Sequence, residues 1–264
     1  MTAAPASLRR VPGAGAITAA YQLGLSTVLT RGRLIASAAL VAIVLIQFSA
    51  IAPDDLEGGF PITFVFLTVV IGLLVPIYVV STASNVFGAA VTDSTLVYPW
   101  LRPARRWQLA IGHIDAALTL NLPVALLCAG GGAAVVVKGF EGYRAGGGGK
   151  LILFACLTAG LTALAYTPIV TALGVRFKRA STFAFVYIFL WEQLFARNNT
   201  GMSRLAIQTY IRSIYFSLSK EEFAGRRLEI GTVVSPGVAW VTLGLIVVAG
   251  TALTAFLLKR SDVA

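Results

Sequence analysis

Long apolar runs separated by short polar segments dominate this chain of 264 residues. The apolar core of a bilayer is about 30 Å thick, and a helix of about 20 residues crosses it. Six segments reach or approach that length, so the pattern predicts six membrane-spanning helices. The predicted spans are 34–52, 62–82, 107–127, 151–171, 182–195 and 237–258. The fifth is the shortest and needs a small extension at each end.

The second predicted span has no clear end on its C-terminal side. Residues 62–91 contain no charged side chain, and this stretch is longer than a bilayer requires. Pro76 lies within it and can kink the helix. We predict that the helix continues beyond the bilayer and turns near Asp93.

Residues 15–30 precede the first span and show a weaker helical pattern. Ile17, Tyr21, Leu25 and Val28 recur at helical spacing beside a row of polar residues. This pattern predicts a helix lying in the membrane interface. The alternative is a leader segment without that role.

A second amphipathic stretch, 203–220, lies between the fifth and sixth spans. Its apolar positions form one stripe: Ile207, Ile211, Ile214, Tyr215 and Leu218. Arg204, Arg212 and Lys220 flank that stripe. The pattern predicts an external helix that rests on the outer leaflet or caps the bundle.

The composition agrees with a membrane location. Hydrophobic residues make up 57% of the chain and charged residues 12%, whereas a soluble domain has about 25% charged residues. We therefore predict an all-α integral membrane protein with a single transmembrane domain, 1–264. It would comprise a cytoplasmic leader (1–33), a six-span bundle (34–258) and a cytoplasmic tail (259–264). The first apolar run begins too late for an ordinary signal peptide, so we expect the N-terminus to be retained.

Lysine and arginine indicate the orientation of the spans. Short segments on one side of the predicted bundle carry twelve of these residues, and those on the other side carry three. The long loop after the fifth span carries six more, but long loops translocate largely regardless of charge. The positive-inside rule therefore places both termini and segment 93–106 in the cytoplasm, at the plasma (inner) membrane. The same rule accounts for the net charge of +10 without a nucleic-acid partner.

No motif in the chain supports ATP binding or catalysis. The stretch RAGGGGKL, 144–151, lacks the first glycine and the final Ser/Thr of a phosphate-binding loop. The cytoplasmic segments contain only the carboxylates Asp93 and Asp262, and the chain has one histidine. These are too few for a carboxylate cluster or a multi-histidine metal site. We predict that the chain is not an enzyme and holds no metal or cofactor of its own.

Three ionisable residues lie in or near the predicted bilayer. His113 and Asp115 are two positions apart, about 200° around a helix, so they face opposite sides and cannot pair. Glu192 lies near the outer end of the fifth span, where a carboxylate usually faces the bundle interior or water. Either it has a packing or functional role, or it is simply interfacial. We take Asp115, Tyr187, Trp191 and Glu192 as candidate residues of a substrate pathway.

The segment 95–113, TLVYPWLRPARRWQLAIGH, resembles the segment after the second span in permease subunits of type-2 ATP-binding-cassette exporters. That family shows a pattern like Thr-Leu-Glu-Tyr-Leu-Leu-x-Arg-Pro-x-x-Arg before its third span. The matching residues are Thr95, Leu96, Tyr98, Arg102, Pro103 and Arg106. Asp93 stands close to the family's acidic position. Ser94 and Val97 depart from the pattern, and Pro99 interrupts the helix.

The resemblance implies that this segment is a coupling helix, the main contact with a separate cytosolic ATPase. The residues assigned to that contact are Asp93, Thr95, Leu96, Tyr98, Trp100, Arg102 and Arg106. Aromatic side chains and arginine are enriched in such contacts, and Leu96, Tyr98 and Trp100 would fill an apolar groove. The alternative for Arg102, Arg105 and Arg106 is contact with anionic lipid.

The resemblance also implies a permease that works as a dimer with two ATPase subunits. It would export a hydrophobic or amphipathic substrate, such as a drug, a lipid or a glycan carrier. Its partners would be a second permease copy or a homologue, the ATPase subunits that bind ATP and Mg²⁺, and membrane lipids. The alternatives are an ATP-independent secondary carrier, which would need charges midway in the membrane or paired broken helices, and a membrane scaffold without transport.

Overall fold

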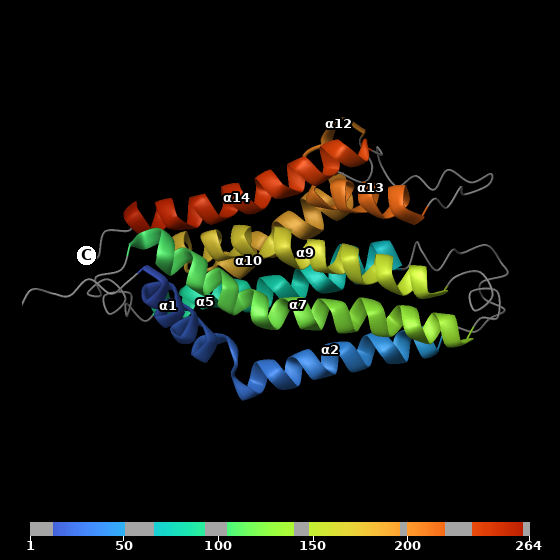
Figure 1. Cartoon of the computed structure of the whole chain (residues 1–264), viewed down its shortest axis with the longest axis horizontal. Coiled ribbons are helices and arrows are strands. Elements are labelled where there is room, and N and C mark those ends of the chain that lie inside the picture. Colours follow the sequence, from blue (N-terminus) through green and yellow to red (C-terminus); the bar gives the residue numbers. More distant parts are fainter. Residues whose placement is uncertain are drawn as a thin grey trace, which may run out of the picture.

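The computed structural model describes residues 13–50, 66–92, 105–139, 148–195, 200–219 and 234–260, and within these ranges the regular structure is entirely helical. The elements are α1 Gly13–Val28, α2 Arg31–Ser49, the π-helix η1 Phe66–Leu74, α5 Val75–Thr92, α7 Arg106–Gly139, α9 Gly148–Arg176, α10 Ala180–Val186, the π-helix η2 Tyr187–Phe195, α12 Thr200–Ser203, α13 Ile207–Ser219 and α14 Pro236–Arg260. The longer helices run side by side along the long axis of the molecule (Figure 1).

Among the residues that the structure describes, five helices are long and apolar enough to cross a membrane, by length and composition. They correspond to the first, second, third, fourth and sixth predicted spans. The fifth predicted span is a shorter apolar helix, Ala180–Phe195, formed by α10 and η2. The sequence prediction of an all-α fold with several candidate spans is therefore confirmed, and the crossing of a bilayer by the fifth segment stays a prediction.

Two of the long helices extend well past their predicted ends. Helix α7 has 34 residues, which corresponds to about 51 Å at 1.5 Å per residue. Helix α9 has 29 residues. Pro123 and Pro168 lie inside these two helices without ending them. The predicted boundaries were too short because hydropathy identifies the part that fits the apolar core and not the helical turns beyond it.

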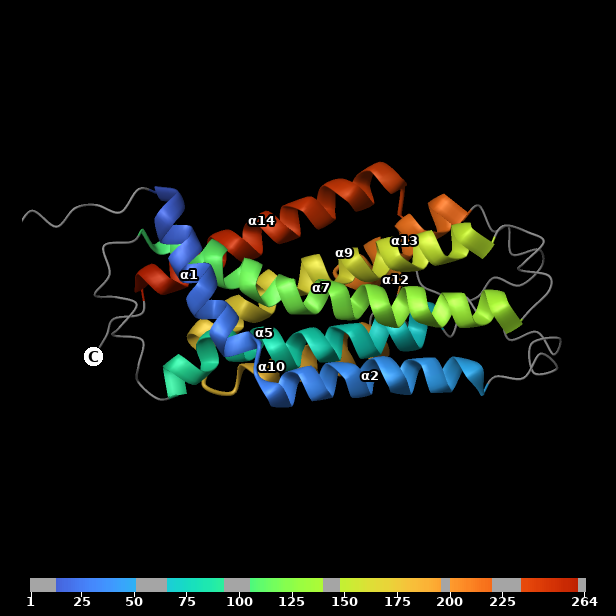
Figure 2. The ribbon, with the colours of Figure 1, turned by 60° about the horizontal axis from the view of Figure 1, so that its bottom comes forward.

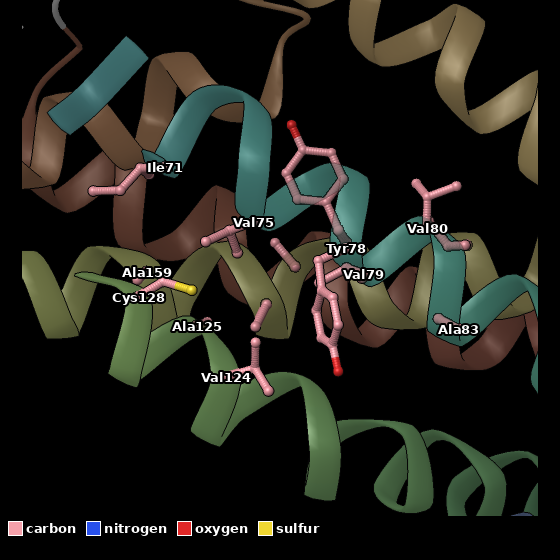
Figure 3. Close-up of a cluster of buried hydrophobic side chains, with 14 of the residues drawn as sticks. Ile71, Val75, Tyr78, Val79, Val80, Ala83, Val124, Ala125, Cys128 and Ala159 are labelled. Carbon is pink, nitrogen blue, oxygen red and sulfur yellow. The ribbon is translucent and has the colours of Figure 1, made fainter. Parts of the chain in front are cut away.

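Helix α9 lies at the centre of the bundle and packs against α5, α7, α13 and α14 (Figures 1 and 2). The core between α5, α7 and α9 combines β-branched and small side chains, including Val75, Val79, Val124, Cys128 and Ala159 (Figure 3). All five are at most 5% exposed. Small residues let membrane helices approach closely, which compensates for the absence of a hydrophobic driving force between helices in lipid.

The helix predicted over residues 15–30 is present as α1, but its buried face matches the predicted stripe only in part. Its buried positions are Ala16, Ala20, Gly24 and Val28, one on each turn. Of the predicted stripe, Val28 is buried, whereas Ile17, Tyr21 and Leu25 are half-buried. Helix α1 runs obliquely across one end of the bundle and packs on α7 (Figure 2). Its position in the membrane interface stays a prediction.

The crossing of α1 and α7 is close because both helices have small residues there. A Cβ atom at Gly112 of α7 would lie 2.6 Å from the Ala20 Cβ and 2.8 Å from the Ile17 carbonyl oxygen. Close backbone approach, and not burial of the largest side chains, thus decides which face of α1 packs on the bundle.

Helix α13 confirms most of the stripe predicted in the external segment. Ile207, Ile211, Ile214 and Tyr215 are at most 4% exposed, while Leu218 is 37% exposed. The helix packs against α9 and α14. Its external position stays a prediction. Arg212, one of the residues predicted to flank this stripe, is itself buried, with 7% of its surface exposed.

Candidate functional site

Most residues of the predicted coupling segment lie outside the described residues. These are Asp93, Thr95, Leu96, Tyr98, Trp100 and Arg102. Arg106 is described: it begins α7 and is half-buried. The prediction that the second span continues as a helix is confirmed up to Thr92, the last residue of α5.

The described ends that flank this segment lie at one end of the bundle. The C-terminal end of α5, the N-terminal end of α7 and the C-terminal end of α14 share it (Figure 1). The basic residues described at these and the neighbouring helix ends are Arg105, Arg106, Arg176, Lys178, Arg179, Lys259 and Arg260. The charge pattern read from the sequence therefore corresponds to one end of the folded molecule.

His113 and Asp115 point to opposite sides of α7, as predicted. His113 is 3% exposed, and its ring stacks on Phe87 of α5 with the centroids 4.3 Å apart. Its Nδ1 lies 2.9 Å from the Leu109 carbonyl oxygen. These contacts make His113 a packing residue between helices, while Asp115 is exposed on the surface of α7.

Glu192 is the centre of a buried polar cluster. The side chain is 2% exposed, which excludes the simple interfacial position considered from the sequence. Its Oε2 accepts a hydrogen bond from the Tyr166 hydroxyl, and its Oε1 accepts one from the backbone N–H of Ile207 at 3.0 Å. Tyr187 is a further hydrogen-bond partner, and Arg212 is close enough to interact electrostatically with the carboxylate.

Two glutamines extend this cluster to the second span. Gln193 Nε2 donates to the Gly72 carbonyl oxygen at 2.6 Å. Gln208 Nε2 donates to the Ile71 carbonyl oxygen at 3.0 Å and lies 3.4 Å from the Tyr166 hydroxyl oxygen. We call Tyr166, Tyr187, Glu192, Gln193, Gln208 and Arg212 the Glu192 cluster. It joins η1, α9, η2 and α13, which are distant in the sequence.

The structure therefore brings together only part of the predicted pathway. Tyr187 and Glu192 belong to the Glu192 cluster, Trp191 is half-buried beside it in the chain, and Asp115 is not among the described partners of Glu192. Sequence reasoning missed Tyr166, Gln193, Gln208 and Arg212 as residues of the site. All four stand in predicted helices, but no spacing rule connects residues on different helices.

Two segments of this region are π-helical, η1 and η2, each of nine residues. A π-helical turn is rare and occurs frequently at functional sites, since it shifts the backbone hydrogen bonds by one residue. Here the two segments supply the backbone carbonyls, the carboxylate and one of the glutamines that meet in the Glu192 cluster.

A second polar group lies between α5, α7 and α9. Thr82 donates to Asn121 Oδ1, and Asn121 Nδ2 donates to Thr167 Oγ1 at 3.1 Å. All three side chains are at most 1% exposed. Because the amide and both hydroxyls are hydrogen-bonded to one another, this group ties three helices together.

Among the residues that the structure describes, no three His, Cys, Asp or Glu side chains lie together to hold an ion. The chemistry of the Glu192 cluster is that of one carboxylate held by tyrosines, a backbone amide and an arginine. The described fold is thus an all-helical bundle with five helices able to cross a membrane and a buried charged cluster. No protein-family model matches the chain, and no curated protein matches it.

Proposed function

We propose that this chain is the membrane-spanning subunit of an ATP-driven exporter and that it works with separate cytosolic ATPase subunits. The observation that carries the proposal is the long second span. The predicted bilayer segment ends at residue 82, but the helix continues to Thr92, about 15 Å further at 1.5 Å per residue. A rigid helix of this kind carries movement from a cytosolic partner into the bundle.

The neighbouring elements support the same proposal. The segment that resembles a coupling helix connects α5 to α7 in the chain. Both helices pack against the central α9. Force applied to this segment would therefore reach the bundle through two helices at once. The basic side chains at the same end agree with a cytoplasmic location under the positive-inside rule. ATP and Mg²⁺ would be bound by the partner.

The transport pathway is proposed to form between two copies of the chain. Asp115 is exposed and Trp191 half-buried, so both side chains reach the surface of the single subunit. Tyr187 is half-buried and Glu192 is buried, and these two residues would shape the pathway by holding its wall. A hydrophobic or amphipathic substrate suits the apolar surface of the helices.

One observation favours a second candidate function, an ATP-independent carrier. Ionisable residues buried in membrane bundles frequently serve as proton or ion relays, and Glu192 with Arg212 is such a pair. This carrier would transport its substrate with a proton gradient and without a nucleotide.

The deciding experiment is copurification with the ATPase. We expect the wild-type chain to retain a cytosolic ATPase subunit in detergent, and Tyr98→Asp and Leu96→Asp to lose it together with ATP-dependent transport. An unpaired charge in an apolar groove costs several kcal/mol, about 2–7 for a polar group without a partner. Phe177→Asp is the matched control, an aromatic residue between α9 and α10 at the same end of the bundle.

If Leu96→Asp and Tyr98→Asp both retained the ATPase, the coupling assignment would be wrong. The segment would then be a lipid-facing connector. Transport that proceeds in proteoliposomes without nucleotide, and that is driven by a pH gradient, would instead support the carrier.

A further inference from the structure

The second span contains a break in its backbone hydrogen bonding. Its helix changes from π-helical to α-helical winding between Leu74 and Val75, and Pro76 follows directly. In π-helical winding the carbonyl of residue 71 accepts from the N–H of residue 76, and in α-helical winding the carbonyl of residue 72 does so. Proline has no N–H. Residue 76 therefore donates to neither the Ile71 nor the Gly72 carbonyl.

One of these two carbonyls therefore lacks its backbone donor, and each of them accepts a hydrogen bond from a side chain of another helix. Gln193 of η2 donates to Gly72, and Gln208 of α13 donates to Ile71, at 2.6 and 3.0 Å. The glutamines lie 121 and 137 residues away from these carbonyls in the chain. In the apolar core of a bilayer no water can donate a hydrogen bond to an unsatisfied backbone carbonyl, so side-chain donors stabilise a broken helix there.

Glycine at position 72 makes the approach of Gln193 possible. A Cβ atom there would lie 3.3 Å from Gln193 Nε2, 3.3 Å from an Arg212 guanidinium nitrogen and 2.9 Å from the Leu67 carbonyl oxygen. A larger residue would therefore push both polar side chains away from the carbonyl.

The rest of the Glu192 cluster holds Gln208 in place. The Tyr166 hydroxyl lies within 3.4 Å of Gln208 Nε2 and itself donates to Glu192, while the N–H of Ile207, the residue before Gln208, donates to the same carboxylate. Gln208 is 2% exposed, so its position is set by these contacts and not by solvent.

We infer that one of Gln193 and Gln208 replaces the backbone donor that Pro76 removes, that the other adds a second side-chain hydrogen bond beside it, and that together they form a clamp which fixes η2 and α13 to the break in the second span. With the clamp in place, η1 and α5 act as one rigid helix. With the clamp open, the break becomes a hinge, and the bend of the second span depends on the position of α13. This inference does not depend on the proposed transport function.

The test is a mutant cycle on the full-length protein in detergent, with amide hydrogen exchange across residues 70–80 as the readout. We expect Gln193→Leu and Gln208→Leu each to accelerate exchange about threefold to twentyfold, since a buried hydrogen bond between membrane helices contributes about 0.6–1.7 kcal/mol. Gln22→Leu, at an exposed position of α1, is the control and should leave these amides unchanged.

The decisive arm repeats both substitutions in a Pro76→Ala background. Alanine restores an N–H at position 76, which reaches one of the two carbonyls, so the effect of at least one glutamine substitution should fall towards that of the control. If a glutamine variant does not accumulate alone, recovery of folded protein with Pro76→Ala supports the clamp, and failure in both backgrounds contradicts it. Equal acceleration in both backgrounds, or none beyond that of Gln22→Leu, would overturn the inference.

Discussion

The buried carboxylate of Glu192 offers the sharpest test of the folded arrangement. In Glu192→Gln the side chain keeps its size, but one of its two oxygens becomes an amide nitrogen that cannot accept a hydrogen bond. Oε1 and Oε2 currently accept from the Ile207 N–H and the Tyr166 hydroxyl, so one buried donor must lose its partner. The negative charge near Arg212 is lost at the same time.

The magnitude follows from these two losses. A buried donor left without a partner costs about 1–3 kcal/mol, and removing one member of a buried charge pair costs about 3–5 kcal/mol. Because both terms describe a single site and overlap, we expect a total near 3 kcal/mol. That corresponds to a decrease in the unfolding midpoint of about 6–12 °C for a protein of this size.

The assay is thermal unfolding of the purified chain in detergent, followed by tryptophan fluorescence and by recovery of monodisperse protein. Asp115→Asn is the matched control, since it also removes one carboxylate charge but from an exposed position. Its effect should stay within about 0.5 kcal/mol. Equal midpoints for the two variants would refute the assignment of Glu192 as the centre of a buried cluster.

Two further predictions concern the first helix and the orientation. Gly112→Leu should displace α1 and make residues 13–28 sensitive to protease, at a cost of about 1–3 kcal/mol for overpacking. Gly32→Leu is the control and should leave α1 protected, because no atom lies within 4 Å of the Cβ position there. Equal protection of α1 in both variants would contradict the close crossing of α1 and α7. A cysteine introduced at position 104, after replacement of Cys128 and Cys156, should resist an impermeant thiol reagent added outside intact cells. Labelling from outside would reverse the predicted topology.

Several features could be predicted from the sequence because they depend on neighbouring residues alone. The apolar runs identified five long helices, since span length is a local property. The spacing of His113 and Asp115 placed them on opposite sides of one helix, because the rotation per residue is the same in every α-helix. The isoleucine stripe of α13 predicted part of its buried face in the same way, because residues at helical spacing share one side of the helix.

Other features were decided only by the tertiary structure. Lipid is as apolar as leucine, so hydropathy does not say which face of a membrane helix meets protein and which meets lipid. Helix α1 accordingly packs through Ala20 and Gly24, and the larger residues of its predicted stripe are not the ones most deeply buried. Arg212, which reads as a solvated charge beside an apolar stripe, is buried because Glu192 lies close to it in space.

The Glu192 cluster has the same origin. Tyr166 and Glu192 are 26 residues apart in the chain, and the glutamine donors are more than 100 residues from the carbonyls of Ile71 and Gly72. Pro76 marks in the sequence that a backbone donor is missing from the second span, since proline lacks an N–H wherever it stands. Which side chains supply the missing hydrogen bonds depends on the packing of η2 and α13 against η1, and only the folded bundle brings those groups within hydrogen-bonding distance.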